Sequence, residues 1–220
     1  MKKYLVASTL LLSSFTSPIF AEEPKSVYFS LGGGVNFISD FELDAEILGE
    51  NINGSFDTNS PFQWSLAIGK KFEDWRLEFN YSAFKTSSDS LTITAGGNGA
   101  TVDLSPELEM DVSSYMIYAY KDFPSDSKLT PYIGGGIGYS QLDVPDQTVG
   151  VLGVNIELEG GEEQLFTFGL KGGVDYEIAE NTTLYSEVGY VNLASFTTDA
   201  GEEYDSNNSF IVSAGLRFSF

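Results

Sequence analysis

Residues 209–220 read SFIVSAGLRFSF, and this stretch decides the fold. Successive side chains of an extended strand point to opposite faces. One face therefore carries Phe210, Val212, Ala214, Leu216, Phe218 and Phe220, and the other carries Ile211, Ser213, Gly215, Arg217 and Ser219. A strand that is apolar on one face and holds an arginine among small residues on the other is typical of a membrane-spanning barrel, with lipid outside and a polar interior.

The N-terminus has the pattern of a secretory signal peptide. Two lysines follow Met1, an apolar and Ser/Thr-rich stretch runs to Phe20, and the small residue Ala21 precedes two glutamates. The apolar part is too short to cross a bilayer as a helix. We predict a signal peptide over residues 1–21 and one barrel domain over residues 22–220.

Seven further segments alternate in polarity as the last one does. They cover residues 26–37, 61–71, 75–82, 108–121, 129–140, 165–178 and 183–193. The connections over residues 38–60, 86–107, 141–164 and 194–208 are long, and those between them are short. This is the layout of an all-β, eight-stranded antiparallel transmembrane β-barrel with short periplasmic turns and four long extracellular loops, which we expect to be monomeric. A water-soluble barrel or sandwich would leave the outward aromatics unexplained.

Three segments carry a family resemblance: SYMIYAYKDF (114–123), PYIGGGIGYS (131–140) and TLYSEVGY (183–190). With them the mature chain resembles the porin-like small outer-membrane β-barrel family, which includes OmpA-type transmembrane domains, Opa-type proteins and rickettsial surface antigens. The resemblance implies a place in the outer membrane of a Gram-negative-type bacterium, among lipid and lipopolysaccharide. It also implies that Phe218 and Phe220 form the signal read by the outer-membrane assembly machinery. Val191 departs from relatives that often carry an inward arginine there.

Charged residues on the inward faces predict an interior network. An eight-stranded barrel is only wide enough for side chains to fill, so such charges must pair. We expect Arg217 to pair with Glu187 across adjacent strands. The alternative is that the charges line a conducting or proton-relay path. The predicted interior set is Arg76, Glu78, Glu109, Asp111, Lys121, Lys171, Asp175, Glu187 and Arg217.

The sequence favours no catalytic or cofactor site. Its glycine runs, such as residues 134–136, lack the helix and the Lys-Ser or Lys-Thr of a phosphate loop. The chain has no histidine, the usual general base near neutral pH. A hydrolase with paired carboxylates is the remaining alternative, and we predict that the protein is not an enzyme.

The long connections are strongly acidic. The formal net charge is −21, which argues against nucleic acid as a partner. Three alternative roles are open for these acids. They keep the exposed surface soluble, they bridge Ca²⁺ or Mg²⁺ weakly to lipopolysaccharide, or they bind an extracellular macromolecule. Residues 91–104 resemble a raised hairpin whose edges would accept a partner strand. The acidic loop surface comprises Asp40, Glu42, Asp44, Glu46, Asp143, Asp146, Glu157, Glu159, Glu162, Glu163, Asp199, Glu202, Glu203 and Asp205.

Together these features predict a non-enzymatic outer-membrane surface protein of adhesin or antigen type, which contributes to envelope structure and surface contact through its acidic loops. The alternative is a small porin or narrow channel for ions or small hydrophobic molecules.

Overall fold

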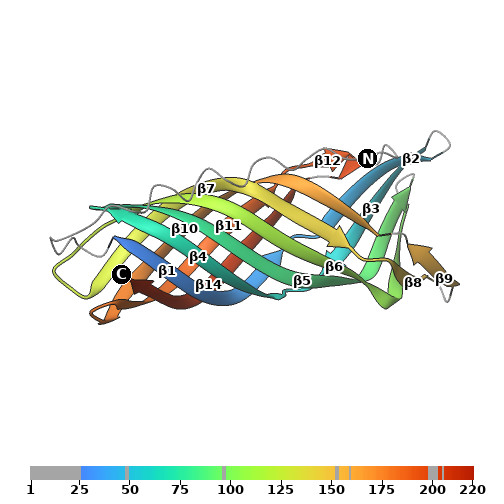
Figure 1. Ribbon diagram of the computed structural model, residues 1–220. Helices are drawn as coiled ribbons and strands as arrows, with labels where there is room; N and C mark the ends of the chain where they lie inside the picture. The colour runs from blue at the N-terminus through green and yellow to red at the C-terminus, as the bar shows by residue number, and fades with distance from the viewer. Residues whose placement is uncertain are drawn as a thin grey trace, which may run out of the picture.

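The computed structural model describes residues 26–47, 50–95, 98–151, 154–158, 160–197, 203–204 and 206–220, so the predicted signal peptide lies outside the described residues. No helix in this part of the chain is long and apolar enough to cross a membrane. Figure 1 shows an elongated β structure whose C-terminus lies at the end with the short turns. Its strands are β1 (Val27–Ile38), β2 (Phe41–Ile47), β3 (Glu50–Thr58), β4 (Phe62–Phe72), β5 (Trp75–Ala95), β6 (Asn98–Asp122), β7 (Leu129–Val144), β8 (Gln147–Val151), β9 (Val154–Leu158), β10 (Gly161–Ala179), β11 (Thr182–Leu193), β12 (Phe196–Thr197), β13 (Glu203–Tyr204) and β14 (Asn207–Ser219).

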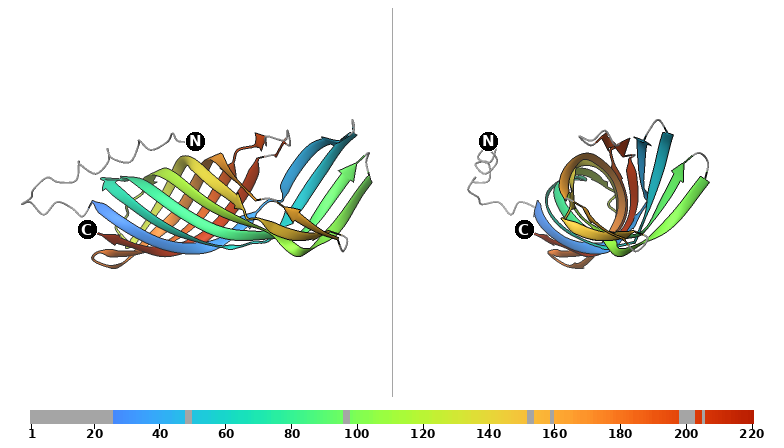
Figure 2. Two further views of the ribbon diagram at one scale, coloured as in Figure 1. Left: turned by 45° about the vertical axis from the view of Figure 1, so that its right-hand side comes forward. Right: turned by 90° about the vertical axis from the view of Figure 1, so that its right-hand side faces the viewer.

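Eight of these strands close into a barrel. The ring runs β1, β4, β5, β6, β7, β10, β11 and β14, with every neighbouring pair antiparallel. The first and last strands pair from Tyr28 with Ser219 to Ile38 with Ser209, which completes the circle. The end-on view in Figure 2 shows this ring. The predicted eight-stranded antiparallel barrel is therefore confirmed.

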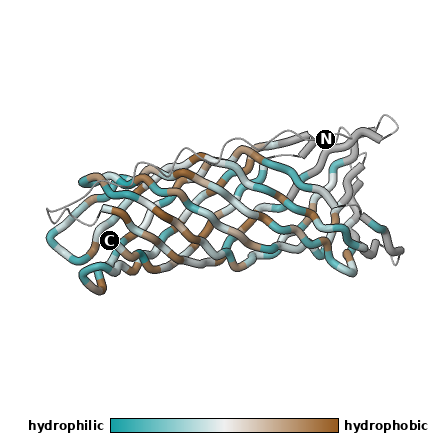
Figure 3. Tube along the Cα trace, in the orientation of Figure 1, coloured by the Kyte–Doolittle hydropathy of each residue, from teal (hydrophilic) through white to brown (hydrophobic). Residues whose placement is uncertain are grey.

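The outer surface of the barrel is apolar, the reverse of a water-soluble fold. Apolar and polar residues alternate along the strands (Figure 3), and large side chains such as Ile137 and Val188 are exposed. Trp64, Tyr81, Tyr115 and Tyr139 follow one another across four strands, with ring centroids 5.3, 5.0 and 5.0 Å apart. We call this row the aromatic girdle; such rows mark the membrane interface of outer-membrane barrels.

The inner surface is filled by tyrosines that lie over glycines of neighbouring strands. A Cβ on Gly136 would lie 2.4 Å from the ring of Tyr118, and one on Gly134 would lie 2.2 Å from the ring of Tyr120. The missing side chains of β7 therefore make room for the tyrosines of β6. The prediction that Glu109, Asp111 and Lys121 of β6 face inward is wrong, because Tyr118 and Tyr120 on the opposite face are buried in the interior and Ile117 is exposed.

Above the aromatic girdle the sheet of the barrel wall continues outward, and we call this part the extension. It consists of the upper parts of β5 and β6 together with β2, β3, β8, β9, β12 and β13. The predicted hairpin is confirmed, since Ser90 pairs with Asp103 and Ala95 with Asn98. Other described strands pair with both edges of this hairpin. Strand β3 pairs along β5, and β8 meets β6 at one residue pair, Leu104 with Val151. Figure 2 shows the β2–β3 and β5–β6 hairpins leaning to one side of the barrel axis.

The tyrosine-over-glycine packing predicts different outcomes for two adjacent substitutions. We expect Gly136→Val to abolish the folded form, because its Cβ would overlap the Tyr118 ring. Gly135→Val is the matched control, since the nearest atom to its Cβ is a leucine methyl of Leu170 at 3.5 Å, an ordinary contact. The measurement is the fraction of unheated protein that migrates as the compact form in gel electrophoresis. Equal fractions for the two variants would contradict this account of the interior.

Candidate functional site

Charged side chains fill the periplasmic half of the barrel interior in two layers. In the lower layer Arg76 Nε donates to Asp122 Oδ1 at 2.8 Å, and Arg217 Nη1 pairs with Asp175 Oδ2. Arg76 also lies 3.7 Å from Asp175, and Lys71, half exposed at the rim, lies 3.4 Å from Asp122. The two arginines and two aspartates therefore form one buried, connected set.

The upper layer joins one lysine, two glutamates and several tyrosines. Lys171 Nζ lies 3.0 Å from Glu187 Oε1, and Tyr132 Oη donates to the other oxygen of Glu187 at 3.1 Å. Glu78 accepts hydrogen bonds from Tyr28 Oη at 2.9 Å and from Tyr120 Oη at 3.3 Å. The tyrosine hydroxyls thus donate hydrogen bonds to carboxylate oxygens that are not paired with a cation.

Aromatic rings surround the cations of both layers. Arg76 lies 4.6 Å from the ring centroid of Tyr132, and Lys171 lies 4.5 Å from that of Tyr118. Cations over aromatic faces are stabilised by the ring quadrupole, more strongly where water is excluded. We call the whole assembly the plug: Tyr28, Arg76, Glu78, Tyr118, Tyr120, Asp122, Tyr132, Lys171, Asp175, Tyr185, Glu187 and Arg217.

The expected pair of Arg217 with Glu187 is not formed. Arg217 stands opposite Thr183 in the register of β11 and β14, and Glu187 stands opposite Ser213, four residues away along the strand. Arg217 reaches instead to Asp175 on β10, and Lys171 pairs with Glu187. The prediction is wrong because adjacent strands bring two residues together only at the same depth, and the register places Arg217 and Glu187 at different depths.

Three predicted members of the interior network lie outside it. Glu109 is exposed, Asp111 pairs with exposed Lys85 at 2.8 Å, and Lys121 pairs with Asp74 at 3.1 Å on the outer side. All three belong to β6, whose faces are reversed relative to our prediction. The reversal also brings Asp122 inward, which sequence reasoning missed, although it shares a face with Tyr118 and Tyr120 by simple alternation.

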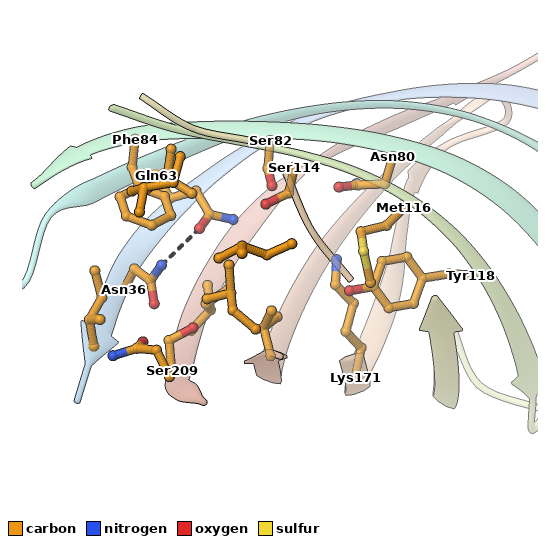
Figure 4. A pocket seen from close by; sticks show the side chains of 18 residues that line it. Asn36, Gln63, Asn80, Ser82, Phe84, Ser114, Met116, Tyr118, Lys171 and Ser209 are labelled. Atoms are coloured by element: carbon orange, nitrogen blue, oxygen red, sulfur yellow. Dashed lines mark hydrogen bonds between the residues drawn. The ribbon is translucent and has the colours of Figure 1, made fainter. Parts of the chain in front are cut away.

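The interior above the plug holds a cavity of about 30 Å³, which we call the upper lumen pocket. All eight barrel strands contribute to its lining. Figure 4 shows Asn36 and Gln63 joined by a hydrogen bond at one end, with Lys171 beside Tyr118 at the other. The polar residues Asn36, Gln63, Asn207 and Ser209 and the apolar residues Phe84, Val112, Leu142, Leu165 and Leu193 belong to the lining.

The described acidic residues of the long connections lie on the extension and at the upper rim of the barrel. Within the described chain no three acidic residues gather closely enough to hold a metal ion. Asp44 and Glu46 lie in β2 and Glu203 in β13. Glu159, Asp199, Glu202 and Asp205 fall outside the described residues. The remaining predicted acids are exposed or half-buried: Asp40, Glu42, Asp143, Asp146, Glu157, Glu162 and Glu163.

The predicted assembly signal lies at the opposite end of the barrel. Phe218 pairs in register with Phe29 on the neighbouring strand, and Phe220 is 71% exposed. The main-chain N–H of Phe220 donates to the carbonyl of Val27 at 2.9 Å, which holds the last residue against the first strand. Recognition by assembly machinery stays a prediction.

A closed ring of eight antiparallel strands with an apolar exterior and a packed polar interior defines an outer-membrane β-barrel. The chain belongs to the family described as the outer membrane protein beta-barrel domain, whose model matches residues 7–218. It is 24% identical over 226 residues to outer membrane protein PagN of Salmonella typhimurium, covering 91% of this chain and 92% of PagN. The protein is thus located in the outer membrane of a Gram-negative bacterium.

Two solved structures share the fold. Neisserial surface protein A is 18% identical, with a TM-score of 0.57 over 88% of this chain and 97% of its own. The outer membrane protease OmpT of Escherichia coli is 9% identical, with a TM-score of 0.56 over 90% of this chain and 97% of its own. Similarity at this level shows the architecture alone.

The plug predicts a large stability difference between two ion pairs. We expect Arg217→Ala to lower the free energy of unfolding by about 3–5 kcal/mol, because it leaves Asp175 buried with only the more distant Arg76. The matched control is Lys85→Ala, which breaks a pair whose side chains are 80% and 40% exposed and should cost far less than the loss of Arg217. Urea unfolding in lipid vesicles measures both. Similar costs for the two variants would show that the plug does not stabilise the barrel.

Proposed function

We propose that the protein is a non-enzymatic surface protein whose barrel anchors an acidic interaction sheet outside the cell. The observation that carries this proposal is the length of β5 and β6, which have 21 and 25 residues while β4 has 11. Residues 82–95 of β5 lie beyond the aromatic girdle and extend about 45 Å along the strand at about 3.3 Å per residue. A barrel with only an anchoring role would not require this structure.

The charge of the extension points to the chemistry of its partner. The sequence of residues 38–61, 83–113, 141–165 and 192–208 contains one lysine or arginine, Lys85, and that residue is already paired with Asp111. The same stretches contain further acids outside the predicted set, namely Asp57, Asp89, Asp103 and Glu107. Acidic residues in these stretches therefore far outnumber the one basic residue. A surface of one sign attracts and orients partners of the other sign over distances near the Debye length. The proposed partner is therefore a basic extracellular macromolecule.

The interior supports an anchoring role over transport. The plug crosses the lumen with paired charges and tyrosines, and the cavity above it measures only about 30 Å³. An ion crossing this region would have to break buried pairs. The absence of histidine supports a non-enzymatic role, since the usual general base near neutral pH is missing.

Electrical recording tests the anchoring role. The purified barrel in a planar lipid bilayer is expected to show no discrete openings at moderate voltage, because a passing ion would have to break the buried ion pairs of the plug. The Arg217→Ala, Lys171→Ala variant serves as the comparison, since it removes two of the plug cations and should raise the conductance. Reproducible unitary openings of the unmodified protein would instead support the narrow-channel alternative.

Adhesion of intact cells tests the interaction role. Cells that display the protein should bind a surface coated with a basic protein, and binding should weaken steeply with salt. Neutralising Asp143, Glu162 and Glu163 to their amides is expected to lower binding severalfold, because these acids lie together where β10 pairs with β7. The matched control neutralises Asp74, Asp126 and Glu177, which lie at the short-turn end of the barrel. Equal losses, or no loss, would contradict the proposal.

A further inference from the structure

A second cavity, of about 170 Å³, lies at the base of the extension on β5 and β6. Four of its lining residues stand directly opposite one another in the strand register, Lys85 with Asp111 and Ser87 with Glu109. By alternation these four share the outward face of the aromatic girdle. The side chains of Lys85 and Asp111 are 80% and 40% exposed, so the cavity is open to the surroundings of the barrel. We call it the rim pocket.

Asn59, on the connection between β3 and β4, forms a further side of the rim pocket and is held in place. Its side-chain Nδ2 donates to Ser87 Oγ at 3.0 Å, and its Oδ1 accepts from Thr86 Oγ1 at 2.9 Å. The main-chain N–H of Ser87 also donates to this Oδ1, at 3.4 Å. Because a main-chain N–H can only donate, this bond sets the orientation of the amide. The pocket is therefore built before any ligand enters.

The height of the rim pocket places it beside the membrane surface. Lys85 follows Tyr81 of the aromatic girdle by four residues on the same face of β5, which is about 13 Å further along the strand at about 3.3 Å per residue. Aromatic rows of this kind lie at the membrane interface. The pocket thus opens sideways into the layer of polar headgroups of the outer leaflet.

The rim pocket carries both signs of charge in a fixed order. Lys85, the lining residue nearest to the girdle on β5, uses one of its three donors for Asp111 Oδ2 at 2.8 Å. Glu109 lies two residues further outward on β6 than Asp111, and no lysine or arginine of the described chain pairs with its carboxylate. The pocket therefore offers ammonium donors close to the membrane and a carboxylate farther out.

This order of charges selects among headgroups. A wholly anionic group would meet two carboxylates in the lining and Asp143, which stands opposite Asp111 on β7. A wholly cationic group would meet Lys85. A zwitterionic headgroup avoids both conflicts if its anion lies toward Lys85 and its cation toward Glu109. In a lipid that carries a phosphate ester and an ammonium, the phosphate is the group nearer to the acyl chains, which is the order the pocket requires.

We propose that the rim pocket binds the zwitterionic headgroup of an outer-leaflet lipid, a phosphate ester that bears a primary ammonium. Lys85 and Ser87 donate to the phosphate oxygens, and Glu109 accepts hydrogen bonds from the ammonium. A cavity of about 170 Å³ has room for such a group, since one water molecule requires only about 10–15 Å³. The site binds a lipid and not a basic macromolecule, so it does not depend on the function proposed for the extension.

Short-chain lipids test the site in the full-length folded protein in micelles of a non-ionic detergent. The side-chain amide of Asn59 and the main-chain amide of Ser87 are followed by ¹H–¹⁵N NMR. We expect dihexanoyl phosphatidylethanolamine to saturate and to shift both signals. Dihexanoyl phosphatidylcholine, whose ammonium has methyl groups in place of hydrogens, should bind about tenfold more weakly, because it cannot donate to Glu109. Dihexanoyl phosphatidylglycerol, which lacks the ammonium, should also bind at least about tenfold more weakly.

Free phosphoethanolamine separates a lipid from a soluble ligand of the same chemistry. We expect it to bind more weakly than the lipid, because the lipid is concentrated in the micelle beside the pocket. Equal affinity would assign the pocket to a soluble compound and would overturn the proposal of a lipid site.

Three variants separate recognition from general electrostatic attraction. Glu109→Gln should remove the tenfold preference for the ethanolamine lipid over the choline lipid, and Lys85→Gln should weaken both, since both carry the phosphate. Glu107→Gln removes the same charge from an exposed acid outside the lining and should leave binding unchanged. The migration of unheated protein on gels confirms that each variant is folded. If the choline lipid binds as tightly as the ethanolamine lipid, or if Glu107→Gln and Glu109→Gln weaken binding equally, the site is rejected.

Discussion

The circumference of eight strands is the constraint on which this structure depends. A barrel of this size leaves room for side chains and not for a water-filled channel, so every inward charge must find a partner on another strand. Arg76, Asp122, Asp175 and Arg217 meet this requirement by joining four different strands. Tyrosines fill the space that remains and donate to Glu78 and Glu187. The interior is therefore a packed core made of polar groups.

Alternation of side chains predicted the faces of most barrel strands, because lipid selects one apolar face and the interior selects the other. It failed at β6, where both faces carry aromatic residues: Tyr115 points toward lipid and Tyr118 toward the plug. Composition alone cannot separate two such faces. Gly134 and Gly136 indicate which face of β6 is inward, because they leave space that only an inward tyrosine from this neighbouring strand would fill.

Partners across the lumen were harder to predict than faces. The Arg217 side chain is several ångströms long, so it can reach acids on more than one strand. The strand register, and not strand adjacency, decides that it pairs with Asp175 and not with Glu187. The extension was predicted only at the hairpin of residues 91–104. The strands β2, β3, β8 and β9 lie in polar, acidic stretches whose pairing depends on the neighbouring β5 and β6 more than on their own pattern. Tertiary context determines such strands.

The extension also gives the molecule a tall side and a low side. Strands β11, β14 and β1 end close together, where Leu193 pairs with Asn207 and Ile38 with Ser209, and the two-residue strands β12 and β13 follow between β11 and β14. By contrast, β5 and β6 continue outward as a long wall. Rotation about the membrane normal therefore changes what a neighbouring membrane protein meets. A neighbour that approaches from the low side reaches the barrel rim directly, and one that approaches from the tall side is held away by the wall. In a densely crowded bilayer, shape alone would favour some lateral arrangements over others.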